Sequence, residues 1–171
     1  YFTHISLMQL GDTERCRGNY DRAATLLADS LTMQGRLGDE RGAGLTLLSL
    51  GNVAHERGDY AAARSFYVRC LEAWRRLGAR QGIGQVTVCL GHLALDEGDL
   101  EEARRRCGEG LALMAELGNG LGVACALEGL AGVAATDGHD ERASRPTAHA
   151  AALRDSLEAP PSPGERSRVD R

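Results

Sequence analysis

Apolar and small residues return along this chain every 40 residues, with polar residues between them. Leucine stands at positions 10, 50, 90 and 130, and glycine follows at 11, 51 and 91, with Ala131 in the fourth place. Three more columns keep this register: Gly18, Gly58, Gly98 and Gly138; Ala23, Ala63, Ala103 and Ala143; Leu37, Leu77, Leu117 and Leu157. Self-similarity at one fixed period predicts an array of similar two-element units.

Each period predicts two amphipathic helices. In the second period, an apolar stripe at i, i+3, i+6 and i+7 predicts a helix over about 41–57. Its residues are Leu47, Leu50, Val53 and Ala54. A second stripe predicts a helix over about 60–77, and it consists of Ala63, Phe66, Tyr67, Cys70, Leu71 and Trp74. Between them, Gly58 suits the left-handed position that ends a helix, and Asp59 suits a helix cap.

Gly51 lies inside the first predicted helix, where glycine costs about 1 kcal/mol relative to alanine. Three of the four periods keep a glycine at this position. We therefore expect another backbone to pass close to Gly51, with Ala63 as the small partner across the contact.

These elements predict an all-α fold, a right-handed α-solenoid of antiparallel helix pairs with about four repeats. The expected repeat domain covers residues 1–158, in units of about 1–38, 39–78, 79–118 and 119–158. Residues 159–171 read as a proline-rich, charged tail or linker. Because Pro146 falls inside the last predicted helix, we expect that helix to begin late or to bend there.

The second unit carries a Leu-Gly pair, a Gly-Asp-Tyr turn, and then an alanine, an aromatic and a small residue. These are Leu50, Gly51, Gly58, Asp59, Tyr60, Ala63, Tyr67 and Cys70. With them the chain resembles the tetratricopeptide repeat family, whose usual period of about 34 residues is here lengthened to 40. The resemblance implies that the first helix of each pair lines a concave surface for a protein or peptide partner.

The stretch from Glu128 to Arg171 is similar to the end of the repeat region in large bacterial ATPase regulators, which often end in a LuxR-type DNA-binding domain. This resemblance implies a non-enzymatic interaction or sensor module that restrains or releases an ATPase core outside this chain. Two alternatives stay open: a free-standing adaptor that scaffolds two proteins, and an enzyme with an unrecognised site in the groove.

The net charge of −4 gives no general attraction to nucleic acid or to an anionic membrane. All 20 basic residues are arginine, which together with abundant alanine and glycine indicates a GC-rich, bacterial genome. The sequence has neither a signal peptide nor an apolar run long enough to span a membrane, so we expect a cytoplasmic protein. It opens on Tyr1 within an apolar stretch, as a fragment of a longer protein would.

No motif for catalysis or for a cofactor is present: GxxxxGK[ST], GxSxG and HExxH are all missing. The five cysteines are odd in number and form no CxxC, so we expect neither disulfides nor zinc, but small fillers between helices. His55 and Glu56 beside Asp59 could be imagined as a general base, yet a polar helix end explains them better. We therefore expect no catalytic residue, no cofactor and no metal.

Charge alternates in blocks along the chain. Residues 41–80 hold seven arginines and three acids, a net +4, whereas residues 81–120 hold three arginines and seven acids, a net −4. Such blocks are usually solvated faces with ion pairs along the helix. The arginine run at 104–106 forms no continuous basic stripe, so we expect no direct contact with nucleic acid.

Mapping the chain onto the family pattern places candidate groove residues on the first helix of each pair. They are Met8, Asp12 and Arg15; Leu45, Leu48, Asn52, His55 and Glu56; Gln85, Val88, His92, Leu95 and Asp96; and Glu128 and Thr136. An apolar strip with polar edges favours a partner helix or an extended peptide, and simple solvent exposure or contact with other domains of the parent protein is the alternative.

Two finer expectations follow for partners. The family's chaperone-binding members grip a C-terminal carboxylate with cations, but Leu48, Cys125 and Gly129 stand at the positions that would carry them, so we exclude that specificity. An open solenoid end at residues 1–10 offers a surface for a dimer.

Overall fold

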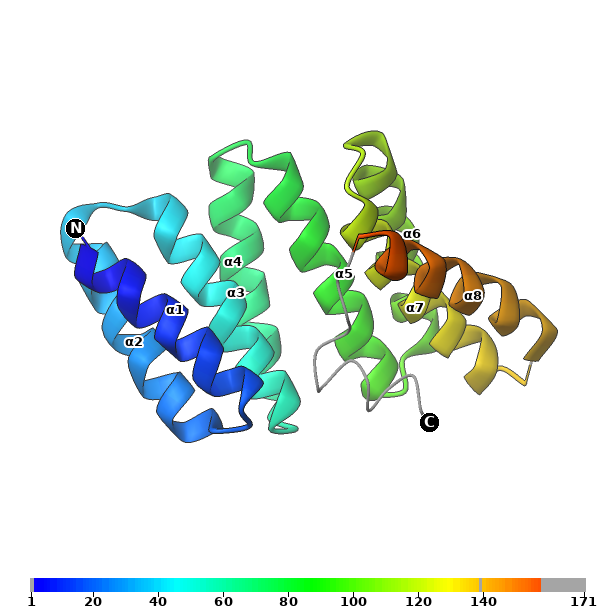
Figure 1. Ribbon diagram of the computed structural model, residues 1–171, viewed down its shortest axis with the longest axis horizontal. Helices are drawn as coiled ribbons and strands as arrows, with labels where there is room; N and C mark the ends of the chain where they lie inside the picture. The colour runs from blue at the N-terminus through cyan, green and yellow to red at the C-terminus, as the bar shows by residue number, and fades with distance from the viewer. Residues whose placement is uncertain (1, 139, 158–171) are drawn as a thin grey trace. The chain divides into compact units, whose positions relative to one another are not determined.

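The computed structural model describes residues 2–138 and 140–157, and these residues form eight helices and no strand (Figure 1). The helices are α1 (Phe2–Cys16), α2 (Tyr20–Leu37), α3 (Glu40–Glu56), α4 (Tyr60–Arg76), α5 (Arg80–Asp96), α6 (Leu100–Glu116), α7 (Gly120–Thr136) and α8 (Asp140–Ser156). The chain divides into two compact units, Tyr1–Ala79 and Arg80–Arg171.

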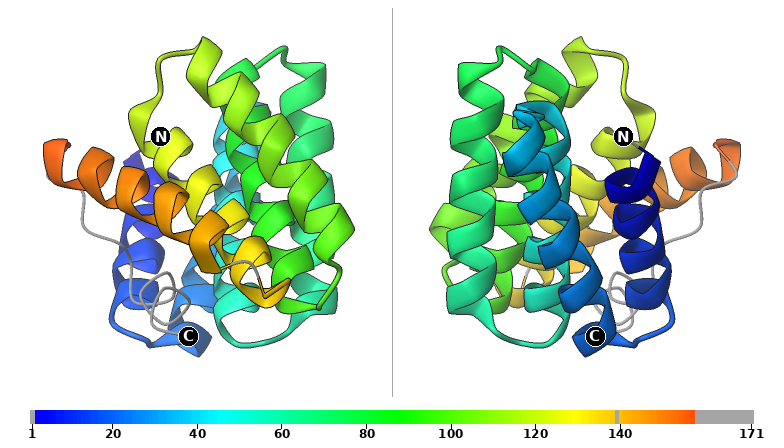
Figure 2. Two further views of the ribbon diagram at one scale, coloured as in Figure 1. Left: turned by 90° about the vertical axis from the view of Figure 1, so that its right-hand side faces the viewer. Right: turned by 90° about the vertical axis from the view of Figure 1, so that its left-hand side faces the viewer.

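Successive helices pack as pairs within each unit. In the first unit α1 packs on α2 and α3 on α4, and α2 also packs on α3. In the second unit α5 packs on α6 and α7 on α8, and α6 also packs on α7. Short turns join the helices, as both views of Figure 2 show. The all-α prediction and the two-helix repeat are confirmed, since the helices expected over about 41–57 and 60–77 are α3 and α4.

The turn between α3 and α4 shows why each helix ends where it does. Gly58 has a φ of +79°, and its N–H donates to the carbonyl of His55. The N–H of Asp59 donates to the carbonyl of Ala54, which completes the hydrogen-bond pair of a Schellman motif. The carboxylate of Asp59 then accepts from the Ala62 N–H and caps α4. Both predicted roles are confirmed.

A column of glycines on the first helices receives side chains from the second helices. A Cβ at Gly11 would come within 2.7 Å of Leu27 Cγ, and one at Gly91 would come within 2.5 Å of Cys107 Sγ. At Gly51 the nearest atoms are those of the Tyr67 ring. The side chain nearest to Gly51 is therefore the Tyr67 ring and not Ala63, which was the expected partner. A backbone atom does approach the same column in other repeats, since a Cβ at Gly11 would lie 3.4 Å from the Ala23 carbonyl oxygen and one at Gly91 would lie 3.0 Å from the Cys107 nitrogen.

The alanine column lies in the core, since Ala23, Ala63 and Ala103 are fully buried. The cysteines differ in burial. Cys70 and Cys107 are buried, as expected of small fillers, whereas Cys16 is exposed and the expectation is wrong for it. Burial raises the pKa of the Cys70 and Cys107 thiols to about 12.

Helix α8 runs without a break from Asp140 to Ser156, with Pro146 inside it. The expected late start at Pro146 is therefore wrong, while the expected bend stays a prediction. The predicted tail, residues 159–171, lies outside the described residues.

Candidate functional site

In the first unit, the predicted groove residues lie on α1 and α3, two helices that contact each other. Leu45 on α3 is 40% exposed, and Ile5 on α1, 40 positions earlier, is 44% exposed. Met8 is half-buried, and Leu48 is buried. The exposed apolar pair of this face is therefore Ile5 and Leu45. Ile5 is not among the predicted groove residues, although the 40-residue register that relates it to Leu45 points to it.

Charged groups tie the ends of α1 and α3 together. Arg15 donates from Nη1 to Glu56 Oε1 at 2.6 Å, and both side chains are largely buried. Beside them, burial raises the pKa of the Asp12 carboxyl, and a hydrogen bond with Ser49 and the charge of Arg15 offset part of that effect. Glu56 and Arg15 therefore neutralise each other on this face.

Polar residues of α3 also bind α4. The Tyr67 hydroxyl donates to Asn52 Oδ1 at 2.9 Å and lies 3.4 Å from His55 Nδ1. The His55 ring is buried and packs edge-on against Tyr60, with centroids 5.8 Å apart. Tyr67 was not predicted as a partner of these groove positions, because its place in the apolar stripe of the second helix indicates a core residue.

In the second unit, the predicted residues lie on α5 and α7. Gln85 is exposed, whereas Val88 is buried and its Cγ2 lies where a Cβ at Gly110 would be. His92 is buried, with Nε2 2.9 Å from the carbonyl oxygen of Cys125 on α7. Leu95 and Asp96 are half-buried near the end of α5, and Thr136 at the end of α7 is exposed.

Glu128 on α7 belongs to a buried ion pair. Arg154 of α8 donates from Nε to Glu128 Oε1 at 2.6 Å and from Nη2 to Glu128 Oε2 at 3.0 Å. The guanidinium also lies 3.3 Å from Cys125 Sγ. Arg154 is 6% exposed, so the pair holds α8 to α7. Arg154 occupies the column of Gln34, Trp74 and Met114, which are all buried, and this register is the signal that could have found it.

The imagined general base is not assembled. Glu56 binds Arg15, and Asp59 accepts the Ala62 N–H as a helix cap. Within residues 2–138 and 140–157, no group of three or more His, Cys, Asp or Glu side chains is placed to hold a metal ion. The polar side chains of this face bind one another and hold helices together.

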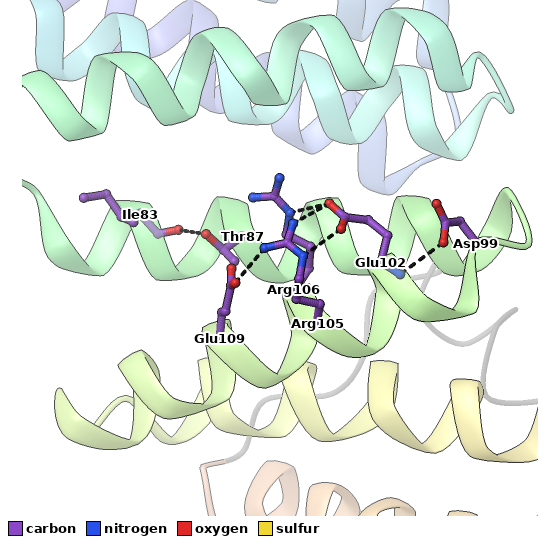
Figure 3. A network of polar contacts seen from close by, with 7 residues as sticks. All are labelled: Ile83, Thr87, Asp99, Glu102, Arg105, Arg106 and Glu109. Atoms are coloured by element: carbon purple, nitrogen blue, oxygen red, sulfur yellow. Dashed lines mark hydrogen bonds and ion pairs between the residues drawn. The ribbon is translucent and has the colours of Figure 1, made fainter.

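Two arginines of the run at 104–106, Arg105 and Arg106, are paired along their own helix (Figure 3). Arg105 bridges Glu102, at 2.7 Å, and Glu109, at 2.6 Å, and Arg106 also binds Glu102. Arg104 binds Asp137, which follows α7. The hydrogen bonds from Arg106 and Arg105 lower the pKa of the Glu102 carboxyl. The expectation of a solvated, ion-paired face is confirmed for α6.

The comparisons bear on this arrangement. Residues 2–76 match the family model of the tetratricopeptide repeat. Tetratricopeptide repeats generally mediate protein–protein interaction and are typically non-catalytic. The crystal structure of BtubC (BKLC) from P. vanneervenii is similar to this chain, with a TM-score of 0.72 at 20% identity. The similarity covers 92% of this chain, which spans 65% of that protein's chain. No curated protein matches the chain.

At this identity the solved structure supports the fold alone. It agrees with the packed helix pairs of both units, and the family match falls on the first unit. In the described part of the chain, no helix is both long enough and apolar enough to cross a membrane.

Proposed function

We propose that this chain is a non-catalytic protein-binding module and that the face shared by α1 and α3 is its contact surface. The observation that carries the proposal is the exposed pair Ile5 and Leu45 on two touching helices. Polar groups further along the same two helices form hydrogen bonds within their own unit, such as Arg15 to Glu56. Such a face suits the apolar side chains of a partner helix or an extended peptide.

The experiment is a selection of peptides from a displayed library on the immobilised protein, followed by affinity measurements on one selected peptide. We expect Ile5→Glu and Leu45→Glu each to weaken its binding about tenfold, since each places a charge in an apolar contact. Leu37→Glu is the matched control, because Leu37 at the end of α2 is 43% exposed and equally apolar. Equal losses in all three variants would refute the α1–α3 face as the contact surface.

The predicted residues of the second unit extend this proposal. Gln85 is the exposed residue of α5 among them, whereas His92 is buried and Asp96 and Glu128 are half-buried. We expect Gln85→Ala to weaken a peptide that contacts α5 and to leave stability unchanged, because an exposed side chain contributes little to folding. A peptide whose affinity is the same for Gln85→Ala and the wild type would limit the contact surface to the first unit.

For the parent protein, we infer a bacterial, cytoplasmic ATPase regulator of the LuxR type, in which this module receives a signal. The support is the resemblance of residues 128–171. The self-paired arginines of α6 favour a protein partner over DNA for this chain. The coding sequence beside Tyr1 and Arg171 tests this: a P-loop upstream and a helix-turn-helix downstream are expected. If neither is present, the free-standing adaptor replaces the regulator.

We also propose that two copies of this chain form a dimer through the exposed side of α1. Leu10 is 40% exposed, whereas Leu50 and Leu90 of the same column are 6% and 4% exposed. If a second copy covers Leu10, the variant Leu10→Glu should be a monomer, because it places a charge in the contact between the two copies. Light scattering after gel filtration measures the molar mass of the variant and of the wild type. A monomer in the wild type at all concentrations would rule the dimer out.

A further inference from the structure

Helix α4 presents exposed arginines that bind no carboxylate in the described part of the chain. These are Arg69, Arg75 and Arg76. Arg69 lies over the Phe66 ring, with its guanidinium carbon 6.0 Å from the centroid. At 100° per residue, they share an arc of about 120° with two other exposed side chains. We call this set the α4 basic face: Val68, Arg69, Glu72, Arg75 and Arg76.

Two of these columns carry the opposite sign in α6. Forty residues after Arg69 and Arg76 stand Glu109 and Glu116. Glu109 binds Arg105 at 2.6 Å, and Glu116 binds Arg80 at 2.6 Å. Glu109 and Glu116 are therefore each paired with an arginine, while α4 leaves three cations and one anion on its face. A solvated face of ion pairs explains α6 and does not explain α4.

We propose that the α4 basic face binds an acidic segment of a partner protein, on a surface separate from Ile5 and Leu45. Guanidinium groups bind carboxylates with two parallel hydrogen bonds. Arg69 and Arg76 are two helical turns apart, or about 10.5 Å along the axis, which matches carboxylates seven residues apart on a partner helix. Val68, 42% exposed, adds an apolar contact beside them.

Charge complementarity selects a short acidic segment over a polynucleotide. The chain as a whole has a net charge of −4, which repels a long polyanion. The arginines of α6 are held by carboxylates, so they provide no second basic surface. A nucleic acid would need a longer continuous basic stripe than one helix face supplies.

The probe is a fluorescein-labelled helical peptide of about 20 residues, with glutamates seven residues apart and a leucine between them. Its binding is measured by fluorescence anisotropy at about 50 and 300 mM sodium chloride, since exposed ion pairs weaken with salt. We expect the variant R69E/R75E/R76E to weaken binding at least about tenfold at the lower salt.

The matched control is R22E/R36E/R41E, which makes the same charge change at exposed arginines elsewhere in the first unit. We expect it to stay within about twofold of the wild type, apart from long-range screening. Circular dichroism checks that both variants fold, and R69Q/R75Q/R76Q replaces the first if it does not. An equal loss in both variants, no binding by the wild type, or tighter binding of a thymidine oligonucleotide at the same salt would overturn the proposal. The test does not depend on the α1–α3 face.

Discussion

Gly51 is covered by the ring of Tyr67, so that a Cβ at position 51 would overlap the ring atoms Cε1 and Cδ1. Tyr67 is 1% exposed and cannot move outward without opening the contact between α3 and α4. Glycine here provides room for an aromatic side chain between the two helices. In this repeat, the glycine at position 51 is therefore explained by the space that the Tyr67 ring needs, and not by a close approach of two backbones.

Replacing Gly51 should therefore destabilise the chain. We expect Gly51→Ala to lower the free energy of unfolding by about 1–3 kcal/mol and Gly51→Leu to lower it further, because the ring must leave its place. Gly108→Ala in α6 is the control, since a Cβ there meets nothing within 4 Å. It should raise stability by about 0.5–1 kcal/mol through helix propensity. Urea titration measures both, and a stable Gly51→Ala would contradict the packing argument.

The ion pair of Arg154 and Glu128 can be tested with residues that the repeat itself provides. Arg154→Met alone should cost about 3–5 kcal/mol, because Glu128 is left buried without its cation. The same columns one repeat earlier hold Met114 and Val88. The double variant Arg154→Met with Glu128→Val should recover most of that loss. A double-mutant cycle by urea unfolding gives the coupling, and additive effects would show that the two side chains do not interact.

The two buried thiols should be unreactive in the folded chain. Cys70 and Cys107 are buried and their pKa lies near 12, so few thiolates form at pH 8. We expect iodoacetamide to label the exposed Cys16 first and these two only after denaturation, as peptide mass spectrometry would show. Cys16→Ser provides the matched control for the fast site. Rapid labelling of Cys107 under native conditions would contradict its burial.

The same thiols predict a loss of stability at high pH. Their pKa rises from 9.0 to about 12 in the folded state, so between these values the folded chain holds protons that the unfolded chain has released. The free energy of unfolding should fall as pH rises through this window, by up to about 1.4 kcal/mol per pH unit for each thiol. Below pH 9 their contribution is constant. The variant C70A/C107A should show a shallower fall, and an unchanged slope would contradict the raised pKa values.

Pro146 should weaken the helix that contains it. A proline in a helix interior removes one backbone hydrogen bond and costs about 3 kcal/mol, and a bend relieves part of this. We expect Pro146→Ala to slow amide hydrogen exchange in α8 and to raise the melting temperature. Ala151→Gly, at an exposed position of the same helix, should have the opposite effect. Identical exchange in wild type and Pro146→Ala would show that the proline costs nothing there.

The periodic sequence predicts the helices and turns well because those features depend on nearby residues. The apolar stripes of α3 and α4, the left-handed Gly58 and the Asp59 cap are all local patterns. What fills the space between two helices depends on side-chain volumes brought together by packing. For this reason the sequence indicated Ala63 opposite Gly51, whereas Tyr67 lies there.

The candidate face is predicted less well, for a related reason. Positions such as Asn52, His55 and Glu56 stand in the columns of the groove, but a column does not say which partner a polar side chain will bind. Glu56 finds Arg15 on another helix, 41 residues away. Arg154 and Glu128 find each other across 26 residues, in columns that are apolar or uncharged in other repeats. Such ion pairs depend on which helices pack together in one repeat. They cannot be read from the residues that recur every 40 positions.

The side chain that packs against each glycine of the column at 11, 51 and 91 is associated with a different hydrogen bond at the next residue along the first helix. Where Tyr67 fills that space, its hydroxyl reaches up to Asn52 and directs that side chain toward its own hairpin. Where Cys107 fills it, His92 in the column of Asn52 reaches across to the carbonyl of Cys125 on the next hairpin. Where Leu27 fills it, Asp12 bonds with Ser49, again on the next hairpin. Replacing one of these interior side chains would thus change which hydrogen bonds the polar residues on the neighbouring face form. The binding specificity of such an array can therefore change through substitutions in its core.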